Sequence, residues 1–352
     1  MNTDYLIIGQ GLAGSLLAWE LIKRNCNVII IDNGLENASQ VAAGLINPIT
    51  GQRFVKSFGI DYLLPTAKNY YEELAYTFQQ SFYIEKTMIR IFNNNKESNS
   101  AIKRLDQADY HPYLGKLDTS PNTLNNICSP FGFIEQNETG YLLIKDLLAC
   151  FKDFFITNEC YKQATVAYQD IQIEPLIKWQ DITAKRIIFC EGYHSGYNPW
   201  FSWLPFQLVK GEILTLRHTQ PLSNKILNFG NWLIPLDNQL FRIGATFDRE
   251  NINDLPTELG KSSLIRSLQT ITNSFIEIDE IKHQANIRPC TLDKEPFIGH
   301  HPLHPQISIF NGFGAKGSLQ LPWYTQKFSD ALLKGTPIPS AINRYYATHF
   351  VT

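Results

Sequence analysis

The sequence predicts an α/β protein with two joined domains, one built on a parallel sheet and one of α+β type built on a largely antiparallel sheet. Three observations lead to this prediction. Residues 4–34 alternate strand, helix and strand around a glycine-rich turn, and an apolar strand at 185–192 ends at a glycine, as a strand that returns to the same sheet does. Residues 207–247 form short β-type runs separated by turn residues. The length of 352 residues exceeds one typical core, which favours two domains.

The first strand–helix–strand unit carries the spacing G-x-G-x-x-G after an apolar strand, which is typical of a Rossmann-like dinucleotide-binding domain. Gly9 is expected to make the tight turn, Gly11 to let the backbone approach a diphosphate, and Gly14 to let helix and strand pack closely. The helix that begins near Leu12 directs its free N–H groups and the positive end of its dipole at the anion. An ordinary glycine turn is the alternative interpretation, and the motif alone does not distinguish FAD from NAD.

Asp32 supports the dinucleotide interpretation, because it lies 18 residues after Gly14, at the end of the second strand. A carboxylate at this place can accept hydrogen bonds from both ribose hydroxyls of an adenosine. The same charge would repel a 2′-phosphate, so NADP is disfavoured.

The segments after this unit are interpreted from composition and periodicity. Residues 39–48 (SQVAAGLINP) are small and can lie flat against a planar ring, although an ordinary loop is the alternative. Apolar residues at mixed spacings of three and four predict a helix over 61–91, which we interpret as a lid or cap. The polar stretch 93–100 (NNNKESNS) has no periodicity and is predicted to be an exposed loop.

The second half predicts an antiparallel sheet followed by a return to the first domain. The β-type runs are QLVKGEILTL and NWLIPLDNQLFRIGATF, and Asp237–Asn238 within the second run is the expected hairpin turn. A helix is predicted to follow at 258–274. The predicted nucleotide-binding domain is discontinuous, and the second domain supplies the substrate site or cap. The boundaries are 1–60, 140–205 and 285–352 for the first domain, and 61–139 and 206–284 for the second.

Charge and composition exclude several function classes. The formal net charge is −2, from 31 basic and 33 acidic residues, so the chain offers no overall positive field for nucleic acid, although it is compatible with a local basic patch. No stretch approaches the ~18 apolar residues of a membrane span. The apolar run Leu6–Ile8 is too short for the core of a signal sequence, so none is expected, and a cytoplasmic location is expected.

Cysteine and histidine patterns do not indicate a metal site. The six cysteines lack C-x-x-C spacing, which favours reduced thiols. His300, His301 and His304 are interleaved with prolines that prevent a helix from aligning them, so we expect solvated loop histidines and no metal.

The C-terminal third carries a specific motif, which reads R-P-x-T-x-D-x-x-P-x-I-G from Arg288 to Gly299. Together with the N-terminal unit, this motif resembles the D-amino acid oxidase superfamily over essentially the whole chain, and most closely its glycine oxidase and sarcosine oxidase-like members. The resemblance implies FAD as the cofactor. It also implies a Rossmann-like FAD-binding domain joined to a substrate domain on an antiparallel sheet.

The resemblance further implies roles for three residues. Arg288 corresponds to the arginine that anchors the substrate carboxylate, a role suited to the two parallel donors of a guanidinium; a purely structural arginine is the alternative. Trp232 and Phe247 correspond to aromatic residues that face the flavin and wall the substrate cavity, with ordinary core aromatics as the alternative.

The FAD contacts implied by the resemblance extend beyond the first turn. Where glycine oxidases read G-H-x-R-N-G-I-L, this chain has GFGAKGSL at 312–319, so FAD binding is expected to survive but glycine as the substrate does not follow. Asn286 occupies the position of the cysteine that tethers flavin in sarcosine oxidases, so FAD is expected to be non-covalent. The expected cofactor contacts are Gly9, Gly11, Leu12, Ala13, Gly14, Asp32, Asn33, Ser39, Ala42, Ala43, Gly44, Val166, Gly192, Gly312, Gly314, Ala315, Lys316, Gly317 and Ser318.

By this resemblance the chain oxidises the C–N bond of a small amino acid or N-substituted glycine. Hydride passes to the flavin, water hydrolyses the imine, and O2 reoxidises the cofactor. Two alternatives stay open. One is the oxidase that trims carboxymethylaminomethyl groups on the tRNA wobble uridine, and the other is a dehydrogenase with an acceptor other than oxygen.

Overall fold

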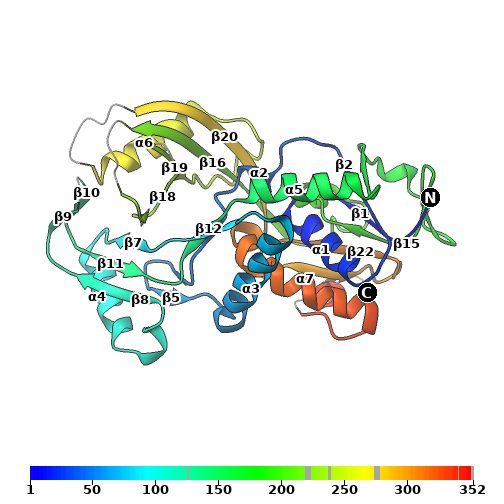
Figure 1. Ribbon diagram of the computed structural model, residues 1–352, viewed down its shortest axis with the longest axis horizontal. Coiled ribbons are helices and arrows are strands. Elements are labelled where there is room, and N and C mark those ends of the chain that lie inside the picture. Colours follow the sequence, from blue (N-terminus) through cyan, green and yellow to red (C-terminus); the bar gives the residue numbers. More distant parts are fainter. Residues whose placement is uncertain (125–126, 219–222, 237–238, 273–277, 340, 350–352) are drawn as a thin grey trace.

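Two large sheets organise the chain, and they occupy opposite halves of the molecule in Figure 1. The computed structural model describes every residue except 125–126, 219–222, 237–238, 273–277, 340 and 350–352. The turn predicted at Asp237–Asn238 therefore lies outside the described residues.

The first sheet contains seven strands in the order β13, β2, β1, β15, β22 and β21, with β14 paired to β15. All neighbours from β13 to β22 are parallel, while β14 and β21 are antiparallel to their partners. The strands are β1 (Asn2–Ile8), β2 (Val28–Asp32), β13 (Tyr161–Gln163), β14 (Ile177–Trp179), β15 (Ile182–Phe189), β21 (Phe297–His300) and β22 (Ile307–Asn311). The predicted strand–helix–strand unit and the return of the chain near residue 185 are both confirmed.

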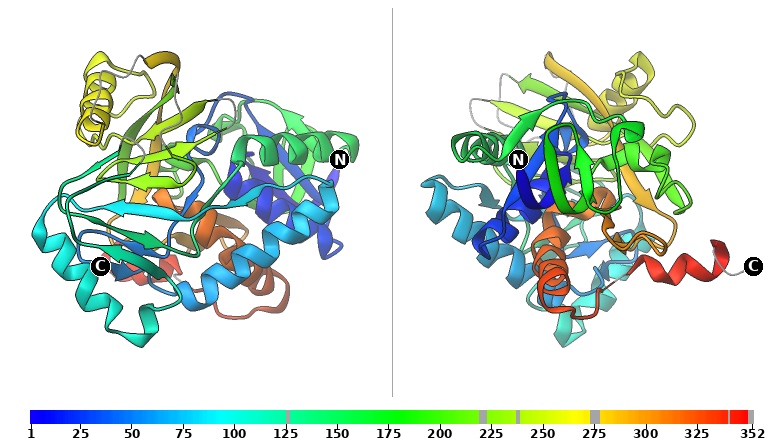
Figure 2. Two further views of the ribbon diagram at one scale, coloured as in Figure 1. Left: turned by 60° about the vertical axis from the view of Figure 1, so that its left-hand side comes forward. Right: turned by 90° about the vertical axis from the view of Figure 1, so that its right-hand side faces the viewer.

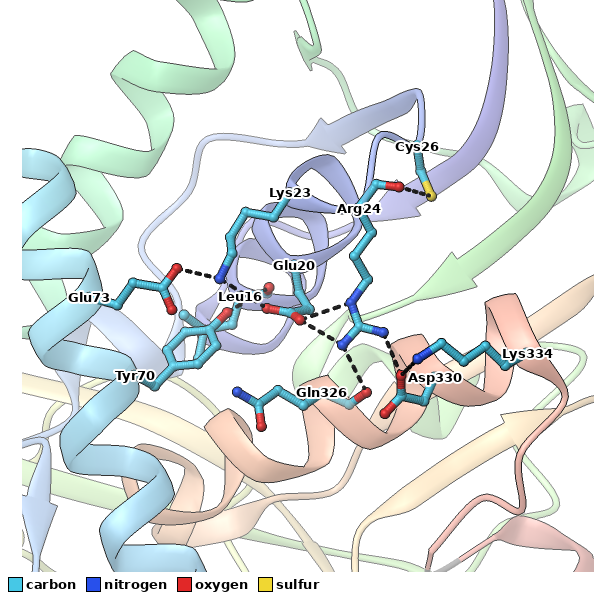
Figure 3. A network of polar contacts seen from close by, with 10 residues as sticks. All are labelled: Leu16, Glu20, Lys23, Arg24, Cys26, Tyr70, Glu73, Gln326, Asp330 and Lys334. Atoms are coloured by element: carbon cyan, nitrogen blue, oxygen red, sulfur yellow. Dashed lines mark hydrogen bonds and ion pairs between the residues drawn. The ribbon is translucent and has the colours of Figure 1, made fainter.

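Three helices share one core against this sheet: α1 (Leu12–Lys23), α5 (Ile144–Thr157) and α7 (Gly317–Lys334). The end of α1 is held to α7 by charged side chains, because Arg24 pairs with buried Glu20 at 2.7 Å and with Asp330 at 2.8 Å (Figure 3). Lys23 also pairs with Glu73, which joins α1 to the neighbouring helix α3.

The helix predicted over 61–91 is shorter than expected and is not a lid. It is α3 (Ile60–Phe78), which ends where Gln79 adopts a left-handed conformation with φ of 52°. Its buried face belongs to the core shared with α1 and α7, and Tyr71 donates a hydrogen bond to the Ser318 carbonyl at 2.6 Å. The rest of the predicted helix forms strands β6 (Tyr83–Glu85) and β7 (Met88–Ile91), and β7 is fully buried.

The second sheet contains eight strands in the order β20, β16, β19, β18, β17, β7, β11 and β8. All its neighbouring pairs are antiparallel except β17 with β7, which confirms the largely antiparallel prediction. The remaining strands are β8 (Leu114–Asp118), β11 (Phe133–Gln136), β16 (Phe206–His218), β17 (Ile226–Asn228), β18 (Trp232–Pro235), β19 (Leu240–Gly244) and β20 (Ile278–Thr291).

The two faces of this sheet differ. Leu214, Leu216 and Ile243 pack with Leu264 and Leu268 of helix α6 (Glu258–Gln269), a shorter form of the helix predicted at 258–274. Figure 2 shows α6 outside the sheet, away from the nucleotide-binding half. Because successive residues of a strand point to opposite faces, the alternate residues of these strands face the first sheet.

The polar stretch predicted as a loop at 93–100 is mostly helical, so that prediction is wrong. Helix α4 (Asn95–Leu105) begins there because the Asn94 side chain accepts from the Glu97 backbone N–H at 3.0 Å. Asn94 is therefore an N-cap, and the acidic Glu97 lies in the first turn, where the helix dipole favours it.

The remaining elements are short. They are α2 (Ala38–Val41), α8 (Tyr346–His349), β3 (Leu45–Ile46), β4 (Ile49–Thr50), β5 (Val55–Lys56), β9 (Asn122–Leu124), β10 (Ile127–Ser129) and β12 (Gly140–Leu142). Strand β12 joins β3 and β6 in a three-stranded sheet next to the cavity described below. No helix of the described residues is long and apolar enough to cross a membrane. The domain boundaries given above remain a prediction.

Candidate functional site

One cavity of about 800 Å³ lies between the two sheets. The nucleotide-type turn and the carboxyl ends of β1, β2 and β15 line one side of it, and the inner face of the second sheet lines the other. Open parallel sheets bind ligands at the carboxyl ends of their strands. The binding crevice lies where the strand order reverses, because the connections from two neighbouring strands lead away in opposite directions there.

The turn after β1 is made by glycines that admit no side chain. Gly9 has φ of 104°, and a Cβ there would lie 2.6 Å from the Cys190 carbonyl oxygen. A Cβ on Gly14 would lie 1.9 Å from the Gly9 carbonyl oxygen, so strand and helix pack backbone to backbone. Gly9 lines the cavity whereas Gly14 does not, in keeping with a packing role for Gly14.

The start of α1 faces the cavity at Gly11, Leu12 and Ala13. Gly11 is the N-cap and contributes no side-chain hydrogen bond, and the Leu12 N–H donates to Ser39 Oγ at 3.1 Å. A Cβ on Gly11 would meet Ser39 Oγ alone, at 3.3 Å. The bare backbone at a helix N-terminus forms a cradle suited to a diphosphate.

Asp32 is held rigidly at the end of β2. One carboxylate oxygen accepts from the Gln10 N–H and the other from the Gly34 N–H, both at 2.7 Å. Each oxygen has a further lone pair, so the carboxylate can also accept from ribose hydroxyls. Its neighbour Asn33 lines the cavity as predicted.

The small residues after α2 form a fixed wall, on which Ala42, Ala43 and Gly44 line the cavity. Gly44 has φ of 71°, and a Cβ there would lie 2.1 Å from the Leu142 carbonyl oxygen. Arg242 of the second sheet donates to the carbonyl oxygens of Val41 and, at 3.2 Å, of Ala42. The wall is therefore tied to the second sheet through Arg242 and packs against β12 through Gly44.

The loop after β15 forms the opposite rim, where Glu191 and Gly192 line the cavity. Val166, which follows β13, also lines it. Glu191 accepts from Tyr168 Oη at 3.2 Å and from Asn198 Nδ2 at 2.9 Å. Burial raises the pKa of Glu191 to about 7, even though these two hydrogen bonds act in the other direction.

The C-terminal loop closes the cavity near the start of α7, with Gly314, Ala315, Lys316, Gly317 and Ser318 among its lining residues. Lys316 Nζ donates to Ser57 Oγ at 3.3 Å. Burial lowers the pKa of Lys316, and the positive charge of the nearby Lys294 lowers it further.

Gly312 does not line the cavity. Its φ of 83°, and a Cβ position 2.8 Å from Thr291, give it a structural role in the turn before this loop.

Arg288 lies on β20 and reaches over Gly211 of the neighbouring strand β16. A Cβ on Gly211 would lie 2.0 Å from Arg288 Nη2, so only glycine leaves room for the guanidinium. Both Nη atoms contact the Thr246 carbonyl oxygen at 3.4 Å. Burial lowers the pKa of Arg288. Arg288 lines the cavity, and its role as a carboxylate anchor stays a prediction.

The two predicted aromatic walls differ. Trp232 lines the cavity, and its ring covers Gly244, where a Cβ would lie 2.4 Å from the indole. Phe247 is 64% exposed, stacks against the Arg249 guanidinium and is not among the lining residues, so the prediction that it forms a cavity wall is wrong. Strand β19 ends at Gly244, three residues earlier, and the chain then turns away.

Asn286, at the position of the tethering cysteine, is buried beside the cavity, and its Nδ2 donates to the Glu36 carbonyl oxygen at 3.5 Å. An amide has no thiolate with which to form a flavin bond.

His300 and His301 are not solvated as expected. Burial lowers the pKa of each to about 4, and His300 bonds Ser308 Oγ at 2.8 Å. Among the described residues, no group of three or more His, Cys, Asp or Glu side chains is arranged to hold a metal ion.

The cavity residues that were missed from the sequence include Arg90 on β7 and Asn228 on β17. Arg90 Nη1 donates to Asn228 Oδ1 at 2.5 Å. The available signal was a single arginine within the apolar run Met88–Ile91, because a charge in a buried strand requires a partner.

Known proteins resemble this chain over most of its length. The family model described as "FAD dependent oxidoreductase" matches residues 4–326. The glycine oxidase of Bacillus subtilis (strain 168) is 22% identical, over 94% of this chain and 93% of that protein. The crystal structure of glycine oxidase from Geobacillus kaustophilus superposes with a TM-score of 0.83 at 20% identity, covering 96% of this chain and 95% of that one.

A second kind of relative also matches. The tRNA 5-methylaminomethyl-2-thiouridine biosynthesis bifunctional protein MnmC of Legionella pneumophila (strain Corby) is 24% identical, over 91% of this chain. The match covers 53% of that protein, so the chain spans about half the length of this bifunctional relative.

Proposed function

The chain belongs to the FAD dependent oxidoreductase family, and from that premise we propose that it oxidises the C–N bond of an N-substituted glycine or small amino acid. The observation that carries the proposal is the Arg288 guanidinium, which lies over Gly211 and lines the cavity. Its planar pair of donors matches the two oxygens of a carboxylate.

The residues that line the first wall of the cavity have the chemistry that FAD requires. The glycine turn and the N-terminus of α1 would hold the diphosphate, Asp32 the adenosine ribose, and the wall at Ala42, Ala43 and Gly44 a flat ring. Bound FAD supplies a two-electron acceptor for the hydride of a C–H bond next to nitrogen.

The chain contributes positioning. Arg288 fixes the substrate carboxylate, and Trp232 limits how far the substrate moves across the sheet, so the reacting C–H bond is held in one orientation. The amine loses a hydride from carbon and a proton from nitrogen, and water then adds to the imine. For an N-alkylglycine cleaved on its carboxymethyl side, the products are glyoxylate and the primary amine. No protein base is needed when the amine binds in its neutral form.

The test is to mix the FAD-loaded protein anaerobically, near neutral pH, with glycine, sarcosine and N-alkylglycines. Reduction of the flavin is measured as bleaching of its absorbance. We expect rapid bleaching by at least one N-alkylglycine and none by the corresponding amine without a carboxylate. A protein that contains FAD but is not reduced by any carboxylated amine would contradict the proposal.

A second candidate is the oxidation of a carboxymethylaminomethyl group on tRNA, which is favoured by the match to the bifunctional tRNA-modifying relatives. That substrate also presents an N-substituted glycine to Arg288. The net charge of −2 gives it no general attraction to RNA. A gel-shift titration with undermodified tRNA at low salt separates the two, because a free amino acid oxidase will not retard the RNA.

The final electron acceptor is proposed to be O2, with peroxide as its product. Mixing the reduced protein with air in a stopped-flow instrument tests this, since a dehydrogenase is reoxidised orders of magnitude more slowly than an oxidase. Acid precipitation of the same sample should release all the flavin, because Asn286 replaces the tethering cysteine.

A further inference from the structure

The inner face of the second sheet carries a row of residues that crosses the sheet from β16, next to Arg288 on β20, to β7. Directly paired residues on neighbouring strands are Arg90, Asn228, Trp232, Gly244 and Ile213, in the order β7, β17, β18, β19 and β16. Side chains of directly paired residues point to the same face of a sheet. All of this row except Gly244 is in the cavity lining, so the row forms the cavity floor.

The two arginines lie at opposite ends of this floor. The Arg288 guanidinium lies over Gly211 on β16, and the Arg90 guanidinium reaches Asn228 on β17 at 2.5 Å. The Trp232 ring lies between them, over Gly244. The floor is therefore cationic at both ends and apolar in the middle.

Arg90 has donors to spare. It is 9% exposed, and its Nε has no hydrogen-bond partner among the residues that the structure describes. Among the described residues, its hydrogen-bond partners are Asn228 and, at 3.5 Å, the carboxylate of Glu97. A buried guanidinium donor without an acceptor costs free energy unless a ligand or water supplies one.

Glu97 orients Arg90 from behind and does not compete for the cavity. It is 1% exposed, does not line the cavity, and accepts from the Asn93 backbone N–H at 3.3 Å. Helix α4 holds it there through the Asn94 cap. In the Arg90–Glu97 pair, the guanidinium therefore lies at the cavity floor and the carboxylate lies behind it.

From this geometry we infer that Arg90 and Asn228 form a second substrate subsite, which binds a hydrogen-bond-accepting group. The substrate is then an N-carboxymethyl amine whose other branch ends in a carboxylate or a carbonyl group. This inference rests on the proposed function, because it takes Arg288 as the anchor of the first carboxylate. It makes glycine and sarcosine poor fits, since each fills one end of the floor only.

The length of the floor sets the length of the substrate. Strands β17 and β16 are three strand spacings apart, or roughly 14 Å at about 4.8 Å per spacing. With two hydrogen bonds of about 3 Å each, roughly 8 Å remain between the two acceptor groups. A short dicarboxylic amine has this length, and its central methylene groups would lie on the Trp232 ring.

The experiment uses thioether analogues, in which sulfur replaces the amine nitrogen so that no oxidation follows binding. The probes are 3-(carboxymethylthio)propionic acid, its propionamide, and (propylthio)acetic acid, which share one carboxylate and differ at the far end. Each is titrated into the FAD-loaded protein by calorimetry and by flavin absorbance. We expect the diacid to bind about 10-fold to 100-fold more tightly than the propyl compound, with the amide between them.

Variants assign this preference to Arg90. Arg90→Met combined with Glu97→Gln leaves no unpaired buried charge, and should bind the diacid and the propyl compound equally. Glu97→Gln alone should keep most of the preference. Arg217→Met is the matched control, because Arg217 is an exposed arginine on β16 that does not line the cavity. If the double variant loses FAD, Arg90→Lys provides the test with a 3-fold to 10-fold drop in preference, about 1 kcal/mol.

The outcomes separate the two proposals. Equal affinity of the wild-type protein for the diacid and the propyl compound overturns the second subsite and leaves Arg288 as the anchor. A preference that persists in the double variant overturns the role of Arg90. Binding of neither compound to protein that retains FAD overturns the proposed function itself.

Discussion

The two walls of the cavity are built from different parts of the chain. On the first sheet, the surface is mostly backbone: bare glycines at 9 and 11, the free start of α1, and a carboxylate already held by two N–H groups. On the second sheet, the surface is side chains, with Arg288 and Arg90 at the ends and Trp232 between them.

This difference has a physical consequence. A backbone cradle tolerates almost no added atom, but it requires no particular side chain to be oriented. A side-chain floor tolerates substitution without loss of the fold, but its specificity depends on the register of the six strands from β20 to β7. We therefore expect changes in the first wall to remove FAD or the fold, and changes in the second wall to alter substrate selection alone.

The largest effect is expected from Gly14→Val. Its Cβ would lie 1.9 Å from the Gly9 carbonyl oxygen, and neither backbone can move without displacing β1 or α1. The free energy of unfolding should fall by at least about 3 kcal/mol, the upper range of overpacking, and FAD should be lost. Thermal unfolding by circular dichroism and flavin content provide the measurement.

Two glycines serve as matched controls for this change. Gly11→Val should lose FAD but keep the fold, because its Cβ meets only Ser39 Oγ. Gly196→Ala should change neither, since nothing lies within 4 Å of its Cβ position and its φ is not positive. Stable, FAD-loaded Gly14→Val protein would break the comparison.

Arg288→Met should have the next largest effect, confined to the second wall. Substrates with a carboxylate should lose about 2 to 5 kcal/mol in kcat/KM, the range for truncating one partner of a buried charged pair. Arg288→Lys should restore part of this, because a point charge cannot reproduce two parallel donors. Flavin content should not change. Equal losses for amines with and without a carboxylate would assign Arg288 to structure.

The contrast also explains what the sequence could predict. The nucleotide-binding turn was predicted because its glycines, helix and acidic residue lie within about 30 residues, in a pattern set by local sterics. Arg90 was not, because its role arises only when β7 pairs with β17, and these strands are far apart in the sequence.

Two further errors have local causes. Phe247 was assigned by resemblance, which cannot show that the strand ends before it. The stretch at 93–100 was judged by its polarity, although the cap Asn94 with Glu97 three residues later is a recognised start of a helix.

Gly211→Ala tests whether the second wall depends on a close approach as the first does. The added Cβ would lie 2.0 Å from Arg288 Nη2, but this is the free end of a flexible side chain that can move away. We expect the stability to be nearly unchanged, and KM for carboxylated substrates to rise by the equivalent of about 1 to 3 kcal/mol, since a charged hydrogen bond is displaced. A large loss of stability would show that this position resembles Gly14.

Glu191 is a titratable side chain of the first wall whose pKa is raised by burial, and it gives the smallest expected effect. Burial raises its pKa from an ordinary 4.5 to about 7, so the folded protein keeps a proton that the unfolded chain releases between these values. The free energy of unfolding should therefore fall as pH rises from about 4.5 to 7 and level off above 7. Each pKa unit corresponds to about 1.36 kcal/mol, and because the Glu191 residue as a whole is only half-buried, solvent screening reduces the total to about 1 to 2 kcal/mol. Glu191→Gln has no proton to release and can still accept from Tyr168, so its stability should exceed that of the wild type increasingly over this range. Denaturant unfolding of both proteins at pH 5, 6, 7 and 8 measures the difference. A constant difference across the four values would mean that the Glu191 carboxyl titrates alike in the folded and unfolded chains, and would contradict the prediction.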